Sequence, residues 1–79
     1  MDLDRLVRDA LSAVLGDRAA SLAGDADLAH HGLTSVQAIE VIFGLEDQLG
    51  IEIPDDLISR ASFRSVDALV QTLLDARGG

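Results

Sequence analysis

Ser35 is the residue whose type and position most clearly indicate chemistry. It follows Gly32, Leu33 and Thr34 and opens an amphipathic stretch that continues to Leu49. In the first turn of a helix, backbone N–H groups lack partners within the helix and the helix dipole has its positive end. A phosphate ester on a hydroxyl there is therefore electrostatically favoured. The position predicts a serine that is modified.

A catalytic serine is a weaker interpretation of the same residue. The sequence around Ser35 lacks the flanking glycines of a nucleophile elbow, and no strand is expected before it. His30 and His31 are close in sequence but lie in a loop, where nothing fixes them as a general base. We therefore expect no catalytic residue and no enzyme activity. For Ser35 alone, an ordinary helix-capping role stays open.

The helix that must position Ser35 has a recognisable beginning. Thr34 and Gln37 have the spacing of a capping box, in which each side chain bonds the backbone N–H of the other residue. The apolar positions after them recur at helical spacing and predict one buried face. These positions are Ala38, Val41, Ile42, Leu45 and Leu49.

The outward face of this helix is expected to combine apolar and acidic side chains. The residues left toward solvent are Val36, Ile39, Glu40, Phe43, Glu46 and Asp47. Apolar contacts surrounded by acid are typical of a transient docking surface for a partner with a basic rim. An inward orientation of Phe43 is the alternative for that residue.

No metal site is expected in the histidine-containing loop. His30 and His31 are adjacent, with Asp25 and Asp27 before them, and this pattern lacks helical ligand spacing. A calcium loop beginning at Asp25 would also need glycine and glutamate at positions where the chain has other residues. His31 is instead a candidate contact for a phosphate on Ser35.

Three further segments complete the expected fold. Apolar residues from Leu3 to Leu15 recur at steps of three and four, which predicts a first helix whose opposite face is solvated. That solvated face comprises Arg5, Arg8, Asp9 and Ser12. The segment 16–33 is expected to be an ordered loop with a helical turn near 18–22, pinned by Leu22, Leu28 and Leu33. A short helix over 55–60 and a last helix capped by Ser65 follow. The apolar stripe expected on the last helix is Val66, Leu69, Val70, Leu73 and Leu74.

The fold class predicted is all-α. It is a small four-helix bundle of three principal helices and one short helix, with a long loop after the first helix. Residues 1–79 form one domain, which we expect to be free-standing and monomeric. The core must be largely aliphatic because the chain has only two aromatic residues, Phe43 and Phe63.

Charge restricts the classes of partner. Fourteen acidic residues against six arginines give a formal net charge of -8, which repels nucleic acid and anionic membranes. No run approaches the length of a membrane-spanning helix, and the first residues do not resemble a signal peptide. The chain has no cysteine, which excludes disulfides and fits a reducing compartment. We expect a cytoplasmic protein with basic partners.

The segments Gly32-Leu33-Thr34-Ser35-Val36 and Gly50-Ile51-Glu52-Ile53-Pro54-Asp55, with the acidic helix between them, resemble the acyl carrier protein family. The resemblance covers nearly the whole chain. It implies that Ser35 receives phosphopantetheine from coenzyme A through a phosphopantetheinyl transferase. It also implies that the arm holds an acyl or aminoacyl group as a thioester. Its expected partners are a loading ligase and acyltransferase or synthase enzymes with basic docking patches.

The kind of cargo stays open at this point. Most acyl carriers have aspartate before the modified serine and leucine after it, whereas this chain has Thr34 and Val36. Fatty acid, polyketide and nonribosomal peptide biosynthesis are all compatible with the pattern. The alternative function is an unmodified helical interaction module derived from a carrier fold.

Overall fold

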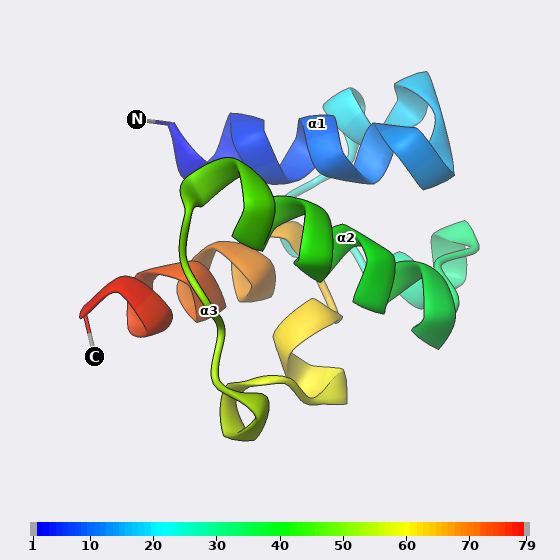
Figure 1. Cartoon of the computed structure of the whole chain (residues 1–79). Coiled ribbons are helices and arrows are strands. Elements are labelled where there is room, and N and C mark those ends of the chain that lie inside the picture. The colour runs from blue at the N-terminus through cyan, green and yellow to red at the C-terminus, as the bar shows by residue number, and fades with distance from the viewer. Residues whose placement is uncertain (1, 79) are drawn as a thin grey trace.

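Three α-helices form where the apolar periodicity predicts them. Helix α1 spans Leu3–Leu15, α2 spans Ser35–Leu49 and α3 spans Val66–Gly78. The computed structural model describes residues 2–78. In Figure 1, α1 runs in the opposite direction to both α2 and α3. No strand occurs within residues 2–78, and the predicted all-α class is confirmed.

The helix ends follow capping chemistry that is visible in the sequence. The Asp2 carboxylate accepts a hydrogen bond from the backbone N–H of Arg5 at the start of α1. Helix α2 ends at Gly50, which has left-handed backbone angles (φ 65°, ψ 32°) that favour glycine. At the start of α3, the Ser65 hydroxyl accepts from the backbone N–H of Ala68 at 3.1 Å.

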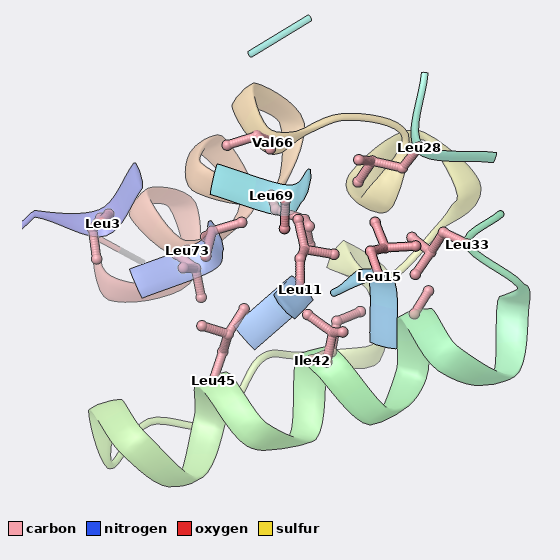
Figure 2. Packing of buried hydrophobic residues seen from close by; sticks show 14 of the residues in the cluster. Leu3, Leu11, Leu15, Leu28, Leu33, Ile42, Leu45, Val66, Leu69 and Leu73 are labelled. Atoms are coloured by element: carbon pink, nitrogen blue, oxygen red, sulfur yellow. The ribbon is translucent and has the colours of Figure 1, made fainter. Parts of the chain in front are cut away.

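One aliphatic core lies between the three helices. Figure 2 shows Ile42 and Leu45 pointing from α2 toward Leu11 and Leu73 of the other helices. These four side chains are at most 1% exposed. The buried apolar set is Leu3, Val7, Leu11, Leu15, Ala19, Leu28, Leu33, Ala38, Val41, Ile42, Leu45, Ile53, Val66, Leu69 and Leu73. The stripes predicted for each helix therefore meet in the same core, although Leu49 and Val70 are only half-buried and Leu74 is exposed.

The long loop after α1 is ordered by two 3₁₀ turns, η1 (Asp17–Ser21) and η2 (Leu28–His31). The turn predicted near 18–22 is confirmed by η1. Leu28 and Leu33 are buried as expected, whereas Leu22 is half-buried. The backbone N–H of Leu28 also donates to the carbonyl of Arg64 at 2.8 Å, which ties the loop to the segment before α3.

The expectation that Arg8 lies on a solvated face of α1 is wrong. Its side chain is only 17% exposed and lies against the loop after α1. Its Nη1 donates to the carbonyl oxygens of Ala19 (3.1 Å), Ala20 (3.3 Å) and Leu22 (2.6 Å). Its Nε pairs with the carboxylate of Asp4 at 2.7 Å. Arg8 thus supplies donors for loop carbonyls that no regular element satisfies.

The short helix expected over 55–60 is instead divided into two 3₁₀ turns. Turn η3 spans Asp55–Leu57 and η4 spans Arg60–Phe63. Ile58 (φ −94°, ψ 105°) and Ser59 (φ −144°, ψ 173°) have extended backbone angles, so the first turn ends before Ser59. Ser59 instead begins the second turn, where its N–H donates to the Ser62 hydroxyl. The chain after α2 reaches α3 through these turns (Figure 1).

None of the helices in the described part of the chain is both long enough and apolar enough to span a bilayer.

Candidate functional site

Ser35 is the first residue of α2, and its side chain is exposed. Both hydrogen bonds of the predicted capping box are present beside it. The Gln37 N–H donates to the Thr34 hydroxyl, and the Thr34 N–H donates to the Gln37 side-chain oxygen, each at 3.1 Å. The capping box fixes the direction in which α2 begins and therefore the position of Ser35.

The hydroxyl of Ser35 differs from those of the other serines. Among residues 2–78 it makes no hydrogen bond, whereas each of the other five serine hydroxyls makes at least one. The backbone N–H groups of Ser35 and Val36 also have no partner in this part of the chain. An exposed hydroxyl beside two open N–H groups is suited to an anionic ester.

A cavity of about 540 Å³ opens directly beside Ser35. Its lining comes from two stretches that are far apart in sequence: residues 27–35, which include η2 and the start of α2, and residues 60–64 around η4. The lining residues are Asp27, Ala29, Leu33, Thr34, Ser35, Arg60, Ala61, Phe63 and Arg64. The volume lies in the usual range for small-molecule sites, and most of the neutral lining residues are apolar.

The charged residues of this cavity are Asp27, Arg60 and Arg64. The Asp27 carboxylate caps η2 by accepting from the Ala29 N–H at 3.0 Å. The chain has no arginine between Arg18 and Arg60, and neither lining arginine was among the predicted site residues. Their spacing of four residues was the available signal. It could not reveal their position beside Ser35, because residues 25 or more positions apart are brought together only by the fold.

Most of the predicted docking residues on α2 face solvent. Val36 is 70% exposed and Phe43 is 61% exposed. Glu40 and Asp47 are also exposed, and Ile39 is half-buried. Phe43 therefore points outward, and the alternative inward orientation is wrong.

Glu46 has a contact that the sequence did not indicate. Its Oε2 accepts from the backbone N–H of Ile53 at 2.7 Å, and the residue is half-buried. Since Ile53 is buried in the core, this bond fixes the segment that leaves α2. A hollow of about 420 Å³ lies next to it, lined by Phe43, Glu46, Asp47, Gly50, Ile51 and Glu52.

The histidines do not join the cavity beside Ser35. His30 lies 3.7 Å from the Asp27 carboxylate, and the carbonyl of His31 accepts from Arg18 Nη2 at 2.8 Å. Neither histidine is among the lining residues, so the cavity gives no support to a contact between His31 and a phosphate. Residues 2–78 contain no group of three histidine or acidic side chains that could hold a metal ion.

The chain matches the family model described as phosphopantetheine attachment site over residues 5–73. An aminoacyl carrier protein from Agrobacterium fabrum is 38% identical over 53 residues, which are 67% of this chain and 64% of that protein. The aligned region thus spans slightly less than two thirds of that relative.

Two solved structures resemble nearly the whole chain. One has a TM-score of 0.82 at 32% identity and the other 0.83 at 31% identity, covering 90% and 92% of this chain and 97% of each matched chain. Both are described as an engineered Bradyrhizobium japonicum glycine:carrier protein ligase complexed with carrier protein from Agrobacterium tumefaciens, one with AMP and one with ATP.

Proposed function

This chain belongs to the acyl carrier protein family, whose members have a phosphopantetheine attachment site, and from that premise we propose that Ser35 carries the arm. Members of this family carry phosphopantetheine as a covalent cofactor and are not themselves enzymes. The arm supplies a thiol, which is the nucleophile that this cysteine-free chain lacks. The proposed task of the protein is to present a thioester to successive partner enzymes.

The observation that carries the assignment to Ser35 is its exposed, unpaired hydroxyl at the start of α2, beside the cavity. In the transfer step, the Ser35 oxygen forms a bond to the phosphorus of the phosphopantetheine group of coenzyme A. The bond from that phosphorus to 3′,5′-ADP breaks, and the serine proton passes to a base of the transferase. The product on Ser35 is a phosphodiester with one negative charge.

The proposed cargo is an aminoacyl group, loaded by an ATP-dependent ligase. This is supported by the likeness to an aminoacyl carrier protein and to carrier chains solved with a glycine:carrier protein ligase. Thr34 keeps the capping oxygen of the usual aspartate but lacks the negative charge that partner enzymes of the family commonly contact. Acyl groups of fatty acid or polyketide biosynthesis are the competing cargo class.

The proposed partner surface is the α2 docking face, defined as Val36, Ile39, Glu40, Phe43 and Asp47. Its apolar members give contact area, and its two carboxylates attract a basic rim on the ligase. Glu46 is left out of this definition because its carboxylate already binds the backbone of Ile53. We also propose that the chain acts as a monomer in the cytoplasm.

Intact mass spectrometry tests the attachment residue. The apo protein is incubated with coenzyme A and a phosphopantetheinyl transferase, and we expect a mass gain of one phosphopantetheine. Ser35→Ala should gain nothing, while the matched control Ser21→Ala, also an exposed serine, should gain the full group. No gain on the wild type, or an equal gain on Ser35→Ala, would favour the unmodified interaction module.

The same preparation tests the cargo. The holo protein is mixed with ATP, glycine and a glycine:carrier protein ligase, and we expect an aminoacyl mass gain that hydroxylamine removes. Loading by an acyl ligase with a fatty acid, and none with the amino acid, would reject the aminoacyl assignment without affecting Ser35.

A further inference from the structure

Arg60 and Arg64 are two positive charges beside the attachment serine in a strongly acidic chain. Both line the cavity that Ser35 opens onto, and both are exposed. Within residues 2–78 neither guanidinium makes a hydrogen bond or an ion pair. Arg8 and Arg18, by contrast, already donate to loop carbonyls. A ligand in the cavity would therefore not have to displace a partner of either arginine within the described chain.

The charge of the cavity suits a monoanion. Two arginines and one carboxylate, Asp27, give its lining a net charge of +1. The Asp27 carboxylate accepts a hydrogen bond from the backbone N–H of Ala29, which partly compensates its negative charge. Guanidinium groups bind phosphate oxygens with paired, charge-assisted hydrogen bonds. The open N–H groups of Ser35 and Val36 are at the start of α2, where Ser35 lines the same cavity.

We propose that Arg60 and Arg64 bind the phosphodiester of the arm and draw its first part into this cavity. The proposal rests on the proposed function, because it requires the arm to be on Ser35. Leu33, Ala61 and Phe63 give the cavity apolar walls, against which the geminal methyl groups of the arm can pack. The first part of the arm then lies next to η4, and the α2 docking face stays exposed for the ligase.

Phosphorus NMR of the holo protein tests this binding directly. The variant Arg60→Gln/Arg64→Gln keeps polar side chains, although shorter ones, and removes both charges. We expect its phosphodiester signal to move away from the wild-type shift, toward that of the same phosphodiester in the urea-unfolded holo protein. The matched control Arg5→Gln/Arg77→Gln loses the same charge from exposed arginines outside the cavity and should keep the wild-type shift.

A second measurement uses the wild type alone. The Nε–Hε signals of Arg60 and Arg64 should shift when the apo protein becomes holo, and added salt should reduce that shift. The signals of Arg5 and Arg77 should not respond. This measurement shows whether the two arginines bind the phosphodiester even if the transferase fails to load the double variant.

Several outcomes would overturn the proposal. If the wild type loads on Ser35 but neither the phosphorus nor the guanidinium signals differ, the arginines do not bind the arm and only this inference fails. If the double variant instead raises the KM of the ligase without moving the phosphorus signal, the arginines contact the partner. If intact mass shows no loading on Ser35, the proposed function itself fails and this inference fails with it.

Discussion

At the residue scale, neighbouring acids on α2 have different tasks. Glu46 and Asp47 are adjacent in sequence and would both belong to a charged outer face by spacing alone. In the structure the Glu46 carboxylate accepts from the Ile53 N–H at 2.7 Å, whereas Asp47 makes no hydrogen bond or ion pair in the described chain. The loss of Glu46 therefore leaves a half-buried backbone donor unpaired, and the loss of Asp47 does not.

A matched pair of alanine variants separates these tasks. Glu46→Ala is expected to lower the free energy of unfolding by about 1.5–3 kcal/mol, as for hydrogen bonds to charged groups. Asp47→Ala should stay within about 0.5 kcal/mol of the wild type. Urea unfolding followed by circular dichroism measures both. Equal stabilities would show that the bond to Ile53 contributes nothing.

At the element scale, α2 combines the proposed attachment residue, core packing and an exposed face in fifteen residues. The capping box at Thr34 fixes its start, Ile42 and Leu45 are buried in the core, and Phe43 remains 61% exposed on the other side. A large exposed aromatic side chain surrounded by acid is typical of a surface that a partner covers part of the time. The outer face of α2 can therefore be contacted without any change in the core.

Variants of the α2 docking face should slow loading without unfolding the protein. Phe43→Ser and Glu40→Arg are expected to raise the KM of the ligase for the holo protein several-fold, because they remove apolar contact and charge attraction. Steady-state loading at two salt concentrations measures this, and Glu40→Arg should weaken the salt dependence.

Asp9→Arg is the control for this pair, because it makes the same change of sign on the exposed face of α1. It should leave the KM nearly unchanged at high salt. An equal effect of Asp9→Arg and Glu40→Arg would indicate that net charge alone, and not α2, guides the ligase.

At the scale of the whole molecule, stability depends on one small core. Within residues 2–78, fifteen apolar residues are buried, and they come from all three helices, from the loop between α1 and α2 and, in the case of Ile53, from the segment after α2. At about 0.05–0.15 kcal/mol per residue, a domain of 79 residues has roughly 4–12 kcal/mol of stability. The net charge of -8 opposes compaction as well.

Shortening a side chain in the centre of this core should remove much of that free energy of unfolding. Leu11→Ala removes a side chain that is 0% exposed and is expected to cost about 2–5 kcal/mol. Leu74→Ala is the matched control, because Leu74 is 46% exposed and should lose far less. Urea midpoints measure both variants, and similar midpoints would contradict the described packing.

The amino-acid sequence by itself determined the elements and the position of the serine. Helical periodicity located α1, α2 and α3, and Thr34 with Gln37 identified the start of α2. These features depend on residues three or four positions apart, so local spacing is sufficient to predict them. The same spacing separated the buried Ile42 from the exposed Val36.

Tertiary structure alone decided which charged side chains have partners. Arg8 binds carbonyls eleven to fourteen residues away, and Glu46 binds an N–H seven residues away, across the end of its own helix. Arg60 and Arg64 meet Ser35 in one cavity only because the chain folds back between α2 and α3. Long side chains reach whatever the fold brings within hydrogen-bond distance, and that neighbourhood is not encoded in local periodicity.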